Sequence, residues 1–431
     1  MNLILLELNE VNFDIVKKYI KRGYKLPAFE KIILDDLRHT ESEKEYDHLE
    51  PWIQWPSVHI GVPYQNHNIF RLGDIINSKQ EQIFEKVEKQ GFTVGAVSPM
   101  NAKNNLENPK YFIPDPWTQT KTDGSFVSEA INKAVSQAVN DNSSSRITIK
   151  SLINLSVACF YLINPFKLFK LSFYAISTLN KPWRKAILLD KLLYEMHKSL
   201  FLYKKPNFSI LFLNACAHIQ HHYFFNSKVI GKDSPKNPKW YLDEYHDPLY
   251  EVLKSYDKKI SDLLKFKNTE LIIATGLSQV PYNKTKFYYR LRNHGNFLEA
   301  LGLKFKKIFP RMTRDFLVEF YNVNDASKCY EDLSSIKLNN QLKLFDHIEQ
   351  KGNELFITLT YPNEINKTDY FTINNKKIYI HKYVVFVAVK NGMHHSKGFV
   401  YFSEKIKKYA PPSDSHVSNI HKTILDYFVI S

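Results

Sequence analysis

The sequence is poor in cysteine and glycine, and it lacks the short motifs of several large enzyme classes. Its 431 residues include 3 cysteines, none in a CxxC pair, which excludes a disulfide framework and favours a reducing compartment. The 13 glycines and 19 prolines exclude a collagen-like or low-complexity chain. No GxGxxG, Walker A or GxSxG motif is present, so the nucleotide-binding and hydrolase frameworks that use them have no support.

Long uninterrupted apolar runs are also missing. Glu7 and Glu10 interrupt the N-terminal run MNLILLELNE, which has no basic first region, so we expect a buried first strand, no signal peptide and a cytoplasmic protein. Residues 149–180 are mostly apolar and aromatic, but no window free of proline and charge is long enough to span a bilayer. This segment predicts either a helical insertion packed on the core or a basic helix pair at the inner face of the membrane.

Positive charge and aromatic side chains are abundant. The 26 Tyr, 30 Phe and 5 Trp residues exclude a disordered chain. Lys and Arg number 59 against 44 Asp and Glu, and the net charge of +15 favours an anionic partner, which we expect to be a small molecule or a glycan. We expect no nucleic-acid partner, because the C-terminal half contains none of the recognition motifs.

Strand-like apolar runs alternate with helical patterns along the chain, which is typical of a parallel α/β sheet. We therefore predict an α/β fold with a mostly parallel central sheet, helices on both faces, a helical insertion and a β-rich C-terminal part. The predicted strands include Leu3–Leu8, Thr93–Ser98, Phe208–Leu213 and Leu271–Thr275. The predicted segments are 1–148 and 206–300 for the core, 149–205 for the helical insertion (a cap or membrane-surface element), 301–390 for a β-rich insertion or cap, and 391–431 for the return to the core.

Polar residues follow the ends of these strands, where open α/β sheets bind their ligands. The densest group is LFLNACAHIQHHYF, residues 211–224, directly after a predicted strand. A helix there would place His218 and His222 one turn apart, with His221 three residues after His218, a spacing at which imidazoles ligate one metal or share a proton. The Glu of the HExxH zinc protease motif is missing, so that mechanism is not expected, and structural histidines are the alternative.

Two further segments hold candidate residues. Residues 49–74 show little periodicity and contain Ser57 beside His59, a hydroxyl with a nearby base, although an aromatic-anchored structural loop is the alternative. Residues 392–402 place His394 and Lys397 at a glycine-bearing turn, where they would complete a site built from distant segments.

The order of these segments resembles the alkaline phosphatase superfamily, in particular its type I phosphodiesterase/nucleotide pyrophosphatase branch. The matching positions are Asn9, Ile60-Gly61-Val62-Pro63, His67-Asn68-Ile69, Asn214 with His218, Tyr256-Asp257, Thr275-Gly276-Leu277-Ser278, and Gly392, His394 and Gly398. The resemblance covers residues 3–402 by order and spacing more than by identity. It implies an alkaline phosphatase-like fold and chemistry on phosphorylated substrates at bound metal.

The departures from the family pattern remove metal ligands. Asn9, Asn214 and Gly276 stand where the family has carboxylates, and Leu277 stands where it has a histidine. Neutral side chains do not offset two divalent cations, so we expect at most one zinc, manganese or magnesium ion, or none. The family nucleophile falls at Glu50-Pro51-Trp52, which has no hydroxyl, so Ser57 is the nearest candidate. The residues that the resemblance implies for a single metal are Asn9, Asn214, His218 and His394.

Three functional hypotheses follow. The first is an enzyme that hydrolyses or transfers at a phosphoester, phosphodiester or sugar-phosphate bond. The second is a metal-independent glycosyl or other group transferase of bacterial surface-glycan assembly, and the third is a catalytically silent binding protein. The candidate catalytic residues are Ser57, His59, Glu10, Glu7 and His222, and the candidate substrate-binding residues are Arg71, Asn101, Lys397 and Gln279.

Overall fold

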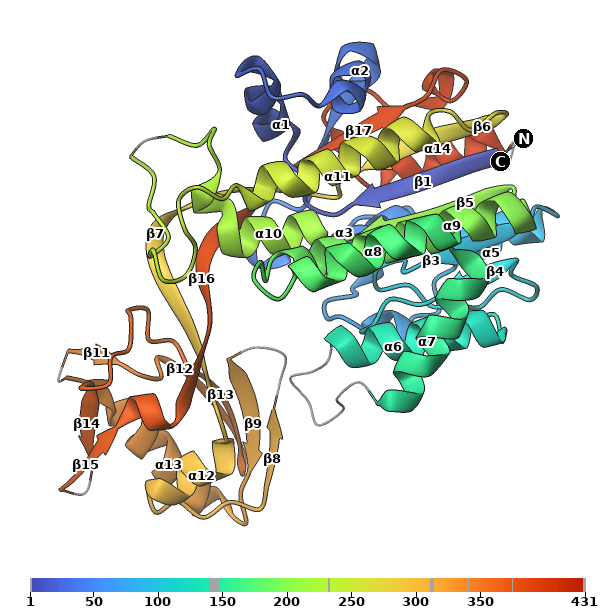
Figure 1. The fold of residues 1–431 in the computed structure, drawn as a ribbon. Coiled ribbons are helices and arrows are strands. Elements are labelled where there is room, and N and C mark those ends of the chain that lie inside the picture. The colour runs from blue at the N-terminus through green and yellow to red at the C-terminus, as the bar shows by residue number, and fades with distance from the viewer. Residues whose placement is uncertain are drawn as a thin grey trace.

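An eight-stranded sheet forms the centre of the protein, in the strand order β18-β2-β17-β6-β1-β5-β3-β4 (Figure 1). The computed structural model describes residues 2–139, 148–231, 233–310, 314–339, 341–373 and 375–428. Neighbouring strands are parallel except where β17 pairs with β6 and β2. The strands are β1 (Asn2–Leu8), β2 (Leu37–Glu41), β3 (Val94–Val97), β4 (Tyr111–Ile113), β5 (Phe208–Leu213), β6 (Thr269–Ala274), β17 (Lys397–Phe402) and β18 (Ser415–His416).

Helices cover both faces of this sheet, because its central strands are apolar on both sides. In β1, Ile4 and Leu6 belong to one core and Leu3 and Leu5 to the other. The first core includes residues of α1 (Phe13–Lys21), α2 (Pro27–Asp36), α6 (Phe126–Val139), α7 (Ile149–Leu162), α8 (Pro165–Ser177), α9 (Arg184–Lys204), α10 (Ala215–Tyr223) and α11 (Pro248–Leu263). The second includes residues of α3 (Pro51–Ile60), α5 (Ile83–Lys89) and α14 (Asn419–Tyr427).

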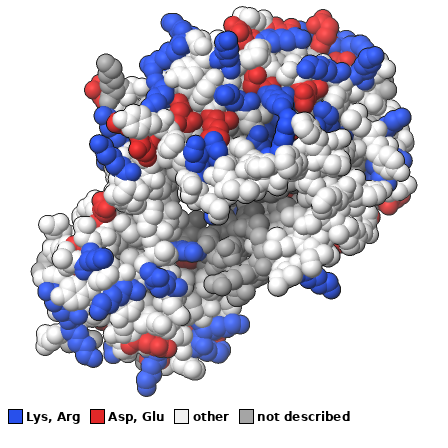
Figure 2. All heavy atoms as spheres, viewed as in Figure 1, with Lys and Arg blue, Asp and Glu red and all other residues white. Residues whose placement is uncertain are grey.

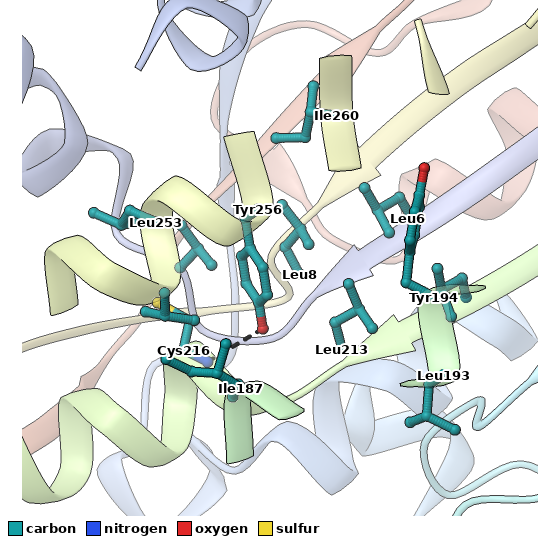
Figure 3. Close-up of a cluster of buried hydrophobic side chains, with 14 of the residues drawn as sticks. Leu6, Leu8, Ile187, Leu193, Tyr194, Leu213, Cys216, Leu253, Tyr256 and Ile260 are labelled. Carbon is teal, nitrogen blue, oxygen red and sulfur yellow. Dashed lines mark hydrogen bonds between the residues drawn. The ribbon is translucent and has the colours of Figure 1, made fainter. Parts of the chain in front are cut away.

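The first core also fixes the start of α10. Figure 3 shows Leu8 and Leu213 of the sheet beside side chains of α9 and α11. Among them is Tyr256, whose hydroxyl accepts a hydrogen bond from the backbone N–H of Cys216 (3.2 Å). Tyr256 in turn donates to Asp190, a buried carboxylate of α9 (2.5 Å). The apolar core therefore encloses a polar contact at the junction of β5 and α10.

A long two-stranded ribbon joins the sheet to a second, smaller unit (lower left in Figure 1). The ribbon consists of β7 (Ser278–Leu291) and β16 (Val384–His395), which are antiparallel. The unit has its own apolar core and a four-stranded antiparallel sheet in the order β12-β13-β9-β8. Its elements are α12 (His294–Ala300), β8 (Lys307–Pro310), β9 (Asp315–Glu319), α13 (Val323–Ser335), β10 (Lys337–Leu338), β11 (Leu342–Lys343), β12 (His347–Lys351), β13 (Glu354–Thr358), β14 (Tyr370–Ile373) and β15 (Lys376–Tyr379).

The predicted fold class is confirmed, with two differences in detail. The C-terminal β-rich part also contains the helices α12 and α13. Residues 49–74, expected to be irregular, contain α3 and the short helix α4 (Tyr64–His67). Pro56 lies inside α3 and cannot donate to the carbonyl of Trp52, but the side chain of Asn101 donates to that carbonyl instead (2.7 Å). Among the described residues, no helix is both long enough and apolar enough to cross a membrane.

Candidate metal centre

The first strand ends in a strained turn that carries a buried carboxylate. Glu10 has a φ of 60°, a left-handed conformation that costs on the order of 1–3 kcal/mol in a residue with a side chain. The amide of Asn9 donates to Glu10 Oε1 (3.1 Å), and the amide of Gln279 donates to Glu10 Oε2. The side chain of Gln220 donates to the backbone carbonyl of Glu10 (2.8 Å). These bonds fix the position of the carboxylate.

Helix α10 places His221 beside Glu10. The first backbone N–H groups of a helix have no partner within the helix, and here Asp190 accepts from that of Ala215 (2.8 Å). This contact fixes where the helix begins. Because each residue turns a helix by a constant angle, a fixed beginning also fixes which face carries His221. His221 Nε2 lies 3.3 Å from Glu10 Oε2.

His394 reaches the same place from β16, which approaches α10 closely at Gly392. A Cβ at position 392 would lie 2.0 Å from Gln279 Oε1 and 2.8 Å from the backbone oxygen of Gln220, so any larger residue would push the strand away. His394 lies opposite Gln279 of β7 in the ribbon. The rings of His394 and His221 have their centroids 5.0 Å apart.

The donor atoms of these three residues form an equilateral triangle. Glu10 Oε2, His221 Nε2 and His394 Nε2 are each 3.3 Å from the other two. In a tetrahedral site with bonds of about 2.0 Å, the ligand atoms are about 3.3 Å apart. The residues therefore fit a divalent ion with three protein ligands. A three-ligand site leaves the fourth position for water or substrate, as catalytic zinc sites do.

Glu50, the residue before α3, lies next to this triangle. Its Oε2 is 3.6 Å from Nδ1 of His394, the ring nitrogen that points away from Glu10. A carboxylate on the far nitrogen of a ligating histidine orients the ring and increases its basicity. Burial raises the pKa of Glu50 to about 7. The charge of His394 lowers this pKa, whereas the negative charge of Glu10 raises it further.

The charges of the triangle favour an ionised Glu10. Burial opposes ionisation, but the charges of His394 and His221 and their hydrogen bonds hold the pKa of Glu10 well below its usual value. Burial also opposes protonation of His394, yet Glu10 and Glu50 raise the pKa of this imidazole above its ordinary value. Glu10 is thus available as an anionic ligand over the whole neutral pH range.

Several of the residues predicted from the sequence lie at this edge of the sheet. Glu10 and His394 are in the triangle, and Gln279 contacts Glu10. Asn9 and Asn214 hydrogen-bond to each other (2.8 Å), and Asn9 also accepts from the indole of Trp55 (2.9 Å). Of the four residues predicted to bind metal, His394 is the one that belongs to the triangle.

His218 and His222 lie on α10 near the triangle. Their rings have centroids 4.7 Å apart, and that of His222 is 6.3 Å from that of His221. His218 is exposed to solvent.

The other predicted catalytic residues are inaccessible. Ser57, His59 and Glu7 have no exposed surface. Ser57 contacts Nε2 of His67 (3.0 Å), whereas His59 Nε2 contacts Glu7 Oε1 (2.7 Å). The expected pairing of Ser57 with His59 is therefore wrong, because both lie inside α3 with different partners.

Three of the four predicted substrate-binding residues lie outside the metal centre. Asn101 is buried and supports the carbonyl of Trp52. Lys397 forms an ion pair with Asp14 (3.1 Å). Arg71 is exposed. None of these contacts involves Glu10, His221 or His394, so the structure gives these three residues no contact with the metal centre.

The sequence places His221 in the histidine cluster but does not single it out as a metal ligand, and it assigns no role to the side chain of Glu50. The helical spacing of the histidines was visible in the sequence, but the rotation of α10 against β1 was not. Glu50 belongs to the segment Glu50-Pro51-Trp52, where the family nucleophile falls, but its contact with His394, a residue far away in the sequence, is made by the tertiary fold and not by a local pattern.

No protein-family model matches the chain, and no curated protein matches it by sequence. Among solved structures, the chain is similar to phosphonoacetate hydrolase from Sinorhizobium meliloti, with 11% identity, a TM-score of 0.43 and coverage of 99% of this chain and 96% of that chain. It is similar to alkaline phosphatase from the Antarctic bacterium TAB5, with 10% identity, a TM-score of 0.42 and coverage of 100% and 98%. It is also similar to murine ectonucleotide pyrophosphatase/phosphodiesterase 5, with 12% identity, a TM-score of 0.40 and coverage of 100% and 96%.

At identities of 10–12% and TM-scores of 0.40–0.43, the likeness assigns neither a substrate nor a reaction to this chain.

Proposed function

We propose that this chain is an enzyme that binds one divalent metal ion through Glu10, His221 and His394 and acts on a phosphorylated substrate. The observation that carries the proposal is the 3.3 Å triangle of donor atoms, contributed by three elements far apart in the sequence. Two imidazoles and one carboxylate favour zinc over magnesium. A bound ion supplies a Lewis acid toward an anionic phosphoryl oxygen.

The surrounding side chains have separate roles in this proposal. Asn9 and Gln279 orient the Glu10 carboxylate through hydrogen bonds, and Glu50 orients the ring of His394. We assign proton transfer to His218. Its side chain is exposed, and desolvation of the ring together with the charge of His221 lowers the pKa of this imidazole to about 4, so the ring is neutral and can accept a proton from a strongly acidified group. Burial and the charges of His218 and His221 hold the pKa of His222 well below its ordinary value, so His222 resists protonation and is given no such role. The reaction is hydrolysis or transfer at a phosphoester, phosphodiester or sugar-phosphate bond.

The geometry gives less support to a metal-independent glycosyl transferase. That alternative uses Glu7 or Glu10 as the general base. Glu7 is fully buried and contacts His59, so a substrate cannot reach it. Burial alone would raise the pKa of Glu10, but His394 and His221 hold this pKa well below its usual value, so Glu10 is a weak base.

The test is turnover of p-nitrophenyl phosphate, bis(p-nitrophenyl) phosphate and a nucleotide-sugar, with and without a chelator. We expect one of the phosphate esters to be cleaved, and we expect the chelator or His221→Asn to abolish cleavage. The matched control is His347→Asn, an exposed histidine of β12 in the smaller unit. Transfer from the nucleotide-sugar in the presence of chelator would support the transferase instead, and a metal-free protein without turnover would indicate a binding protein.

A further inference from the structure

Helices α7 and α8 carry apolar side chains on their outer surface. Six of these residues are between 58% and 71% exposed, and we call them the α7–α8 face: Ile153, Phe160, Phe166, Phe169, Phe173 and Ile176. The four on α8 recur at intervals of three and four residues, which places them on one side of that helix. In Figure 2 the surface over these two helices is largely uncharged.

This exposure is unusual for helices that pack on a core. An amphipathic surface helix turns its apolar side inward and its polar side to water. Here Ala158, Cys159 and Leu171 already fill the inward side. The outer apolar side chains are therefore additional to those that the fold needs. Exposed apolar side chains gathered on neighbouring helices are typical of a docking site for a protein or a membrane.

The charges around the face point to an anionic partner. Residues 149–180 contain Lys150, Lys167 and Lys170 and no Asp or Glu. Lys167 is paired with Glu195 of α9 (2.5 Å), so Lys150 and Lys170 are the lysines that carry the charge argument. Lys170 Nζ lies 4.2 Å from the centre of the Phe166 ring, so the basic and aromatic groups share the same surface. A second copy of the chain fits this surface poorly, because a two-fold interface would bring the lysines of both copies together.

We propose that the α7–α8 face docks on the surface of an anionic lipid bilayer. The helices have 14 and 13 residues, too short to cross about 30 Å of hydrocarbon, so they lie in the plane of the interface. Phenylalanine side chains enter the boundary between headgroups and acyl chains, and lysine side chains extend to the lipid phosphates.

The docked face is joined to the helix that carries His221. Trp183, directly before α9, packs against Tyr223 at the end of α10, with ring centroids 6.1 Å apart. The hydroxyl of Tyr174 in α8 and the indole N–H of Trp183 both donate to Glu251 of α11 (3.1 and 2.9 Å). Docking would therefore fix the orientation of α10 relative to the lipid surface.

The experiment is co-sedimentation of the full chain with vesicles. Two compositions are compared, phosphatidylcholine alone and phosphatidylcholine with about one third phosphatidylglycerol. We expect binding to the anionic vesicles that weakens as salt is added. The triple variant Phe166→Ser, Phe169→Ser, Phe173→Ser should bind at least about 100-fold more weakly, because three phenylalanine side chains no longer leave water. Lys150→Gln with Lys170→Gln should weaken binding by about fivefold per lysine.

A matched control removes exposed apolar residues elsewhere, with Leu34→Ser, Tyr245→Ser and Tyr321→Ser in one chain. It should bind vesicles as the unchanged chain does, and all variants should keep the same melting temperature. Absence of binding, or equal binding by the phenylalanine variant, would overturn the proposal. So would a dimer in sedimentation velocity that the phenylalanine variant abolishes. The assay needs no turnover, so its failure is distinguishable from failure of the proposed reaction.

Discussion

Replacing Gly392 by alanine tests whether the close approach of β16 and α10 holds the metal centre together. The new Cβ would lie 2.0 Å from Gln279 Oε1 and 2.8 Å from the Gln220 carbonyl oxygen, where contacts below 3.0 Å are essentially never seen. Gln279 Oε1 must then move by at least 1.0 Å and the backbone of Gln220 by at least 0.2 Å. Relieving such overpacking costs about 1–3 kcal/mol of the free energy of unfolding.

The same movement disturbs the ligands. Gln279 donates to Glu10, and Gln220 precedes His221 on α10, so both neighbours of the new methyl group are coupled to the triangle. Metal sites tolerate changes of about 0.2 Å in ligand distance. We therefore expect Gly392→Ala to lower metal affinity by about 10- to 100-fold, as loss of a supporting contact does.

The assay is competition for zinc against a chromophoric chelator, together with thermal unfolding. The control is Gly295→Ala in α12, where the nearest heavy atoms to an added Cβ are 3.4 Å away and the backbone needs no positive φ. Affinity of Gly392→Ala within about twofold of the unchanged chain would show that β16 does not need this approach to place His394, and would refute the reasoning.

Three further predictions concern single residues. His218→Ala should lower turnover by about 100-fold with metal content and melting temperature unchanged, because the side chain is exposed and is assigned to proton transfer; unchanged turnover would remove that role. Asn101→Ala should destabilise the protein by about 1–3 kcal/mol in urea unfolding, because the carbonyl of Trp52 loses its donor, and a cost near zero would contradict this. Burial lowers the pKa of His197 to about 3 from about 6.5 in the unfolded chain, so the unfolded chain binds a proton that the folded chain does not. Stability should fall as the pH is lowered through this window, by up to about 1.4 kcal/mol per pH unit, and His197→Gln should show a shallower slope in unfolding measured across that range.

The sequence predicted those elements whose cause is local. The continuous apolar run Phe208–Leu213 forms β5 with the predicted bounds, and the run Leu3–Leu8 forms β1, which begins one residue earlier at Asn2. The helix α3 was not predicted, because residues 49–74 show little periodicity. The helix also contains Pro56, which has no backbone N–H to donate, and the side chain of Asn101, 45 residues further along the chain, supplies the missing donor.

The site was predicted in part for the same reason. Glu10 and His394 were candidates because each follows or enters a strand end, and strand ends meet in space. The choice of His221 over His218 depends on the rotation of α10, which Asp190 fixes from another helix. A contact of that kind has no counterpart in the local sequence.

The most direct test of the central claim is the metal content of the purified chain, compared with that of Glu10→Gln and His221→Asn. If Glu10, His221 and His394 hold one ion, elemental analysis should return one equivalent of zinc or another divalent metal in the unchanged chain and close to none in either variant, with folding retained by circular dichroism. Two equivalents in the unchanged chain, or one equivalent that survives both substitutions, would contradict the account.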